Sequence, residues 1–126
     1  MKLIYVAHIF SGEQCNAERA EKLTAILNGW IQGAVFICPW LPMVRHWVDS
    51  GETRARGLQL DLECVRQTDG LLALTPLVGG VLQEWDVAEN KVLCDTTAII
   101  NDVSPDWTGF ELIQSWVDSL NGASDR

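Results

Sequence analysis

Short apolar runs recur along the chain, and longer stretches of mixed polarity separate them. The runs "LIYVA" (3–7), "AVFIC" (34–38), "GLLALT" (70–75) and "KVLCD" (91–95) contain many large or β-branched side chains. Such runs are typical of strands that are buried on both faces of a parallel sheet. The stretch "TAII" (97–100) either extends the fourth strand or forms a further short strand.

Apolar residues at three- and four-residue spacing predict helices between these strands. We expect helices over 13–33 and 53–68, another that begins near Gly80, and a last one that begins near Ser104-Pro105. The inward positions are Ala20, Leu23, Leu27, Trp30 and Ile31 in the first helix, Leu58, Leu62 and Val65 in the second, Val81, Trp85 and Ala88 in the third, and Phe110, Ile113, Val117 and Leu120 in the last.

The alternation of strands and helices predicts one α/β domain over residues 1–126. Right-handed crossovers then favour a small doubly wound, flavodoxin- or Rossmann-like parallel sheet of four to five strands flanked by helices. Ligands of such sheets bind beyond the carboxyl ends of the strands. Residues 8–12, 39–49 and 76–84 are therefore the places to look for a site, the second of them in a proline-bounded segment (39–53) that we expect to be irregular.

Charge and composition narrow the classes of partner. The 126 residues carry a net charge of −8, with 9 basic against 17 acidic side chains, which argues against a nucleic-acid partner. No stretch approaches the roughly 18 apolar residues that cross a membrane, and the N-terminal run resembles a strand more than a signal peptide. The four cysteines are widely spaced and are expected to be free thiols without a metal, as in a cytoplasmic protein.

Two carboxylates fall where apolar side chains are expected. Glu84 lies at the edge of the stripe of the third helix, and Asp61 lies on the inward face of the second. Buried carboxylates are unfavourable unless hydrogen-bonded, and they often mark functional sites. The structural alternatives are that Asp61 accepts a backbone hydrogen bond and that Glu84 caps the first turn of its own helix.

The first loop, "HIFSGE" (8–13), holds Ser11 and Gly12 just before a helix N-terminus, where free N–H groups bind anions. A serine and a glycine are common in turns of any kind. Neither a dinucleotide-binding glycine motif nor a P-loop is present in the sequence.

Four short motifs, in this order and at these intervals, resemble the nucleoside 2-deoxyribosyltransferase family, including the deoxynucleoside 5′-monophosphate N-glycosidases. They are Tyr5 in the first strand, Asp61-Leu62, Thr68-Asp69-Gly70, and Gly80 four residues before Glu84. The resemblance covers roughly residues 3–100 and is closest to the short members found in bacteria and their phages.

The resemblance implies that Glu84 is a nucleophile that attacks C1′ of a 2-deoxyribosyl group. Asp61 would bind a sugar hydroxyl or assist the base, and Tyr5 would orient Glu84. The residues implied to bind substrate are His8, Phe10, Ser11, Gly12, Gly79 and Gly80. The substrate would be a small deoxynucleoside or deoxynucleotide, with no cofactor and no metal, and the chain would form at least a homodimer.

Two residues depart from the family pattern. Val78 stands where the family often has a serine or aspartate, and His8 stands where a small residue is common. His8 either replaces a lost contact, signals a changed ligand, or is an ordinary turn histidine. The alternative function is therefore a non-catalytic nucleotide-binding or signalling module.

Tryptophans and arginines near the expected site leave their roles open. Trp40 and Trp47 could stack a base, pack within the loop, or form a subunit interface. Trp116 is expected to be exposed on its helix and to add apolar area for dimerisation. Arg54 and Arg56 either approach a phosphate or belong to a solvated helix start.

Overall fold

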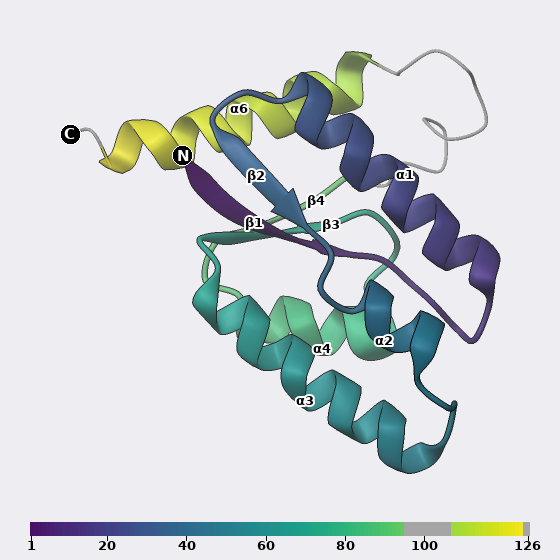
Figure 1. The fold of residues 1–126 in the computed structure, drawn as a ribbon. Coiled ribbons are helices and arrows are strands. Elements are labelled where there is room, and N and C mark those ends of the chain that lie inside the picture. The colour runs from purple at the N-terminus through teal and green to yellow at the C-terminus, as the bar shows by residue number, and fades with distance from the viewer. Residues whose placement is uncertain (95–106, 125–126) are drawn as a thin grey trace.

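The computed structural model describes residues 1–94 and 107–124 (Figure 1). In chain order its elements are β1 (Lys2–Ala7), α1 (Gln14–Trp30), β2 (Ala34–Ile37), α2 (Leu41–His46), α3 (Gly51–Gln67), β3 (Gly70–Ala73), α4 (Gly79–Val87), β4 (Lys91–Leu93) and α6 (Trp107–Ser124). The predicted stretch 97–100 and the predicted helix start at 104–105 lie outside the described residues.

The strands form one four-stranded parallel sheet in the order β2-β1-β3-β4. Ile4 of β1 pairs with Phe36 of β2 on one side and with Gly70 of β3 on the other. Leu71 of β3 pairs with Lys91 of β4. The chain therefore winds outward in both directions from β1 and β3, which confirms the prediction of a small doubly wound α/β fold.

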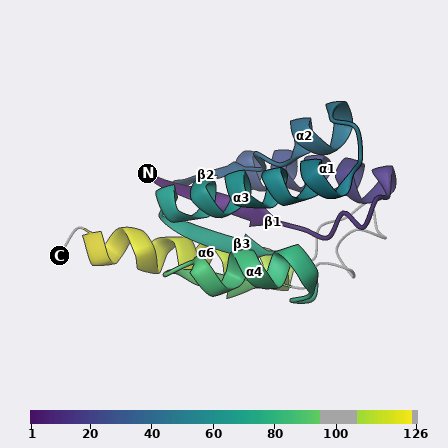
Figure 2. The ribbon, with the colours of Figure 1, turned by 90° about the horizontal axis from the view of Figure 1, so that it is seen from below.

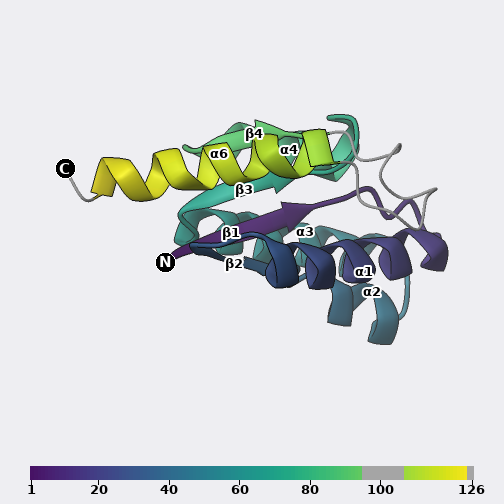
Figure 3. The same cartoon turned by 90° about the horizontal axis from the view of Figure 1, so that it is seen from above.

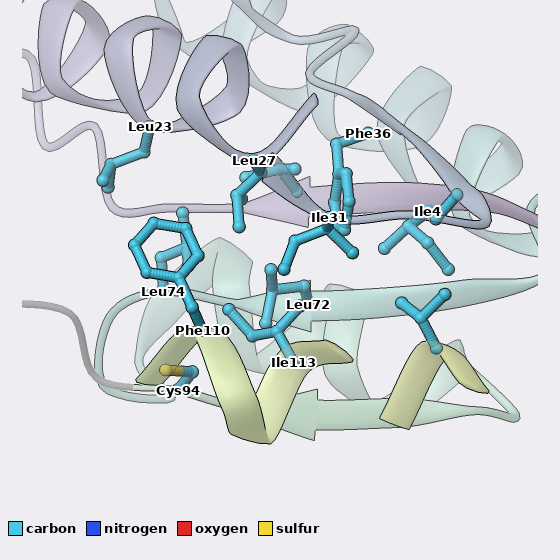
Figure 4. Close-up of a cluster of buried hydrophobic side chains, with 13 residues drawn as sticks. Ile4, Leu23, Leu27, Ile31, Phe36, Leu72, Leu74, Cys94, Phe110 and Ile113 are labelled. Atoms are coloured by element: carbon cyan, nitrogen blue, oxygen red, sulfur yellow. The ribbon is translucent and has the colours of Figure 1, made fainter. Parts of the chain in front are cut away.

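Helices cover both faces of this sheet. α3 and α4 lie on one face (Figure 2), and α1 and α6 lie on the other (Figure 3). Strand residues alternate between the two layers. Ile4 and Val6 belong to the cluster under α1 and α6, whereas Tyr5 and Ala7 belong to the cluster under α3 and α4. Figure 4 shows the first cluster, where Phe110 and Ile113 of α6 meet Leu72 and the α1 leucines.

The predicted helices all exist, but three details of the prediction are wrong. The segment 39–53 is not irregular throughout, because residues 41–46 form α2 with Pro42 in its first turn. α3 begins at Gly51, where a capping box joins Ser50 and Thr53. Trp30, expected to point inward, is 56% exposed because α1 ends there and Ile31 turns into the core instead.

The expectation that Trp116 is exposed on its helix is also wrong. Its side chain is partly buried and packs against the cluster under α1 and α6 rather than standing free on the surface. A Cβ on Gly70 would lie 3.0 Å from two atoms of the Trp116 ring, so the indole fits over a backbone position that lacks a side chain. This tryptophan therefore offers less surface for dimerisation than its sequence position indicates.

Two smaller observations concern the other sequence expectations. All four cysteines are free thiols, with Cys15 exposed and Cys94 buried. Among the helices of residues 1–94 and 107–124, none has the length and apolar character needed to cross a bilayer.

Candidate functional site

A cavity of about 380 Å³ opens at the carboxyl edge of the sheet. All three stretches that the fold rule singled out, 8–12, 39–49 and 76–84, contribute residues to its lining, and α3 closes one side. Asp61 and Glu84 both line it. The prediction that these two carboxylates share one pocket is confirmed.

Glu84 is placed by the geometry of α4. This helix begins at Gly79, which has a φ of +53°, a conformation that glycine adopts without strain. Val81 and Glu84 are the two buried residues of α4, one turn apart. Glu84 is only 6% exposed, and its Oε2 atom has no hydrogen-bond partner in the described part of the chain. The carboxyl therefore does not cap its own helix.

Burial raises the pKa of Glu84 to about 8. The Tyr5 hydroxyl opposes this by lowering that pKa, and the negative charge of Asp61 raises it further. Losing water disfavours the ionised carboxylate, and a neighbouring acid adds to the effect. A raised pKa in a cavity wall is a frequent property of groups that take part in proton transfer or covalent chemistry.

Asp61 enters the cavity from the middle of α3, which packs against α4. Its Oδ1 atom is buried and has no hydrogen-bond partner in residues 1–94 and 107–124. This atom therefore does not accept the backbone hydrogen bond that was the structural alternative for Asp61. Burial raises the pKa of Asp61 to about 7. The outward positions of the same helix, Gln59 and Glu63 among them, are exposed, as the pattern of the sequence predicts.

Tyr5 lies behind the carboxylates rather than in the cavity wall. It is fully buried in the middle of the sheet and belongs to the cluster under α3 and α4. Burial raises the pKa of Tyr5 well above its ordinary value, and the charges of Glu84 and Asp61 raise it further. The phenol thus keeps its proton as a donor near Glu84, although the two groups are not in hydrogen-bond geometry here.

The first loop brings His8, Phe10, Ser11 and Gly12 to the cavity, all four of which the resemblance implied. Ser11 and Gly12 both have positive φ values, 51° and 72°. His8 is 4% exposed and donates from Nδ1 to the carbonyl of Ile9 at 2.6 Å. Burial lowers the pKa of His8, so it is a neutral imidazole that holds the turn.

Gly79 and Gly80 complete the set of predicted substrate-binding residues, and both line the cavity. Val78 also lines it, as the N-cap of α4, and supplies no side-chain hydrogen bond there. The departure from the family pattern at this position therefore leaves the first turn of α4 without a polar cap.

The apolar wall of the cavity comes from the loop–α2 region. Trp40 is 5% exposed, donates from Nε1 to the carbonyl of Val6 at 3.2 Å, and lies 6.4 Å from Phe10 between ring centroids. Trp47 is 40% exposed and also lines the cavity. Trp40 therefore fits the loop-packing alternative, while Trp47 presents an accessible ring.

Sequence reasoning missed Met43 and Val44 of α2, which also line the cavity. The signal was present, because Trp40, Met43, Val44 and Trp47 follow one another at helical spacing. Pro39 and Pro42 led us to expect an irregular segment there instead of a helix.

The two arginines considered as phosphate-binding residues lie in different places in the structure. Arg54 lines the cavity and forms a bidentate pair with Asp49, which the sequence analysis did not single out. Arg56 is absent from this lining and donates to Gln59 at 3.4 Å. Within the described ranges, no three His, Cys, Asp or Glu side chains lie together as a metal site would require.

Compared with family models, curated proteins and solved structures, the chain matches none of them.

Proposed function

We propose that this chain cleaves or transfers the N-glycosidic bond of a 2-deoxyribonucleoside or its 5′-monophosphate, with Glu84 as the nucleophile. The observation that carries the proposal is the pair of buried carboxylates, Asp61 and Glu84, in one cavity at the carboxyl edge of the sheet. The order of motifs described above supports the choice of substrate class.

Cleavage of an N-glycosidic bond develops positive charge on C1′ and negative charge on the departing base. A carboxylate stabilises the first and can trap it as an ester, and a protonated acid stabilises the second. In the proposed reaction the Glu84 carboxylate bonds to C1′, the C1′–N bond breaks, and its electron pair leaves with the base. Asp61 or water donates the proton that the base takes.

The second half of the reaction releases the sugar from Glu84. Attack by water on C1′ breaks the ester, giving the free 2-deoxyribose or its phosphate and restoring the carboxylate. Attack by a nitrogen of a second base instead gives a new nucleoside. Asp61, having lost its proton, can accept one from the attacking group.

The raised pKa values set a condition on this chemistry. Glu84 must ionise while Asp61 keeps its proton, yet burial brings the pKa of Glu84 to about 8 and that of Asp61 to about 7. The reactive form is therefore a minor one in the empty cavity. Tyr5 favours it, because its hydroxyl lowers the pKa of Glu84. Positive charge developing on the sugar favours it too.

The same observation favours a second candidate, a nucleotide-binding module without turnover. A carboxyl group with a pKa of about 8 is mostly neutral at pH 7 and can serve as a hydrogen-bond donor to a ligand. A neutral Glu84 would bind without attacking.

One experiment separates the candidates. The protein is incubated with a panel of deoxynucleosides and their 5′-monophosphates, and released base is measured by chromatography. Glu84→Gln should reduce turnover on the order of 10³-fold or more while keeping the fold. Asp61→Asn should give an intermediate loss.

Glu89→Gln is the matched control, because Glu89 is exposed and absent from the cavity lining, and it should leave turnover unchanged. Base release that survives intact in Glu84→Gln would refute the nucleophile. No base release from any member of the panel would favour the binding module.

A further inference from the structure

The cavity is poor in positive charge. Four side chains of charged type occur in its described lining, namely the acids Asp49, Asp61 and Glu84 and the single cation Arg54. His8, also in the lining, has a lowered pKa and is neutral. A ligand that carries its own negative charge therefore finds Arg54 as the one cationic side chain in this described lining.

The one cation is already engaged. Arg54 donates from Nε to Oδ1 of Asp49 at 2.6 Å and from Nη2 to Oδ2 at 2.8 Å. This fork leaves both carboxylate oxygens bonded, and it keeps the pKa of Asp49 below its ordinary value, so the pair is ionised and locally neutral. Both side chains are more than half exposed, so the pair adds little to stability but cancels the charge of Arg54 at the cavity.

The other donors at the cavity, the Ser11–Gly12 loop before α1 and the N-terminus of α4, carry only partial charges and attract an anion weakly. The N-terminus of α4 carries a partial positive charge of roughly half a unit. It faces a cavity that already contains Asp61 and Glu84, and its N-cap is Val78, which has no polar side chain. Phe10, Trp40 and Trp47 instead provide an apolar, aromatic wall for an uncharged ring.

We propose that the cavity binds the uncharged deoxynucleoside and discriminates against its 5′-monophosphate, and that Asp49 is the residue that sets this selectivity by neutralising Arg54. The choice of ligand class rests on the proposed function. The selectivity itself follows from the charges around the cavity. At pH 7 Glu84 is mostly protonated and Asp49 is paired, so the repulsion on a phosphate dianion comes from the partly ionised Asp61. Across a partly hydrated cavity this repulsion should weaken binding by on the order of tenfold.

The test is a binding measurement at pH 7 with deoxyadenosine and deoxyadenosine 5′-monophosphate. It uses the Glu84→Gln protein. The uncharged amide of glutamine stands in for the Glu84 carboxyl, which is mostly protonated and therefore also uncharged at this pH. Binding is followed by calorimetry or by tryptophan fluorescence, to which Trp40 and Trp47 in the cavity lining contribute. The nucleoside should bind on the order of tenfold more tightly than the monophosphate.

Adding Asp49→Asn should bring the two affinities together or reverse their order, because Arg54 becomes available to the phosphate. Adding Arg54→Gln to that variant should restore the preference for the nucleoside. Glu63→Gln is the matched control, since Glu63 is an exposed acid of α3 that pairs with Arg66 away from the cavity. It should leave the ratio of affinities unchanged.

Equal or tighter binding of the monophosphate would overturn the proposal, as would binding of neither ligand or an unchanged ratio in a folded Asp49→Asn protein. Failure of the proposed function is a different result. If the wild-type protein binds the nucleoside preferentially but releases no base, the selectivity stands and catalysis does not. If it releases base faster from the monophosphate, catalysis stands and the selectivity does not.

Discussion

Replacing Glu84 with glutamine should stabilise the protein at alkaline pH, whatever reaction the cavity supports. The folded protein raises the pKa of Glu84 from 4.5 to about 8, mainly through burial. In the unfolded chain this carboxyl loses its proton near its ordinary value. Between these two values the folded state binds the extra proton, so the stability of the wild-type protein falls as the pH rises from about 4.5 to about 8.

The size of the effect follows from the same two values. Each pKa unit corresponds to about 1.4 kcal/mol, so the difference between 4.5 and about 8 lowers the free energy of unfolding by on the order of 5 kcal/mol as the pH rises through that range. Glutamine has nearly the same shape and never ionises. Glu84→Gln and wild type should therefore be close in stability near pH 4.5, diverge up to about pH 8, and keep that difference at pH 9.

Urea denaturation at a series of pH values measures this difference, with tryptophan fluorescence as the signal. Glu89→Gln is the control, since an exposed glutamate changes its environment little on unfolding. A pH-independent difference between Glu84→Gln and wild type would refute the reasoning. So would a wild-type protein that is the more stable of the two at pH 9.

Four further predictions concern catalysis, packing and assembly. The rate of base release should peak between pH 7 and 8, because Glu84 must lose its proton and Asp61 must keep one; a rate independent of pH from 6 to 9 would contradict this. Tyr5→Phe should lower the maximum rate and move the falling limb of that profile to higher pH, because the hydroxyl lowers the pKa of Glu84 and its loss makes the reactive form rarer; an unchanged profile would show that Tyr5 has no such role. Gly70→Ala should lower the free energy of unfolding by about 1–3 kcal/mol through the contact with the Trp116 ring, measured by urea denaturation. The chain should form at least a homodimer, and a monomeric mass by ultracentrifugation at micromolar concentration would count against it.

The strands and the inward carboxylates could be predicted because each depends on the local pattern of apolar and polar residues along the chain. A strand buried on both faces must be apolar along its length, and Asp61 and Glu84 stand out because they interrupt a helical apolar stripe. The rule that ligands of open α/β sheets bind beyond the carboxyl ends of the strands then predicted a site at three stretches, 8–12, 39–49 and 76–84. The cavity is lined by residues from all three.

What could not be predicted depends on contacts between distant residues. Trp116 is covered because Gly70, in another element, leaves room for its ring, and nothing near Trp116 in the sequence indicates this. The Asp49–Arg54 pair joins residues only five apart, but it depends on how the chain turns between α2 and α3, which the sequence pattern does not specify. The pKa values of the two acids depend on the depth of burial, which a stripe pattern does not measure.

The separation of acids and apolar wall between different elements has a consequence for how this protein can diversify. Asp61 and Glu84 stand on α3 and α4, which pack on the sheet, whereas Met43 and Val44 belong to α2, a six-residue helix with no buried residue. Leu41, Met43 and Val44 pack against the cluster under α3 and α4 only as partly buried side chains, so substitutions there should disturb the core less than substitutions of its fully buried members. For the proposed function, directed evolution of ligand range would therefore begin at residues 43 and 44 of this short helix, where substitutions leave the pair of acids in place.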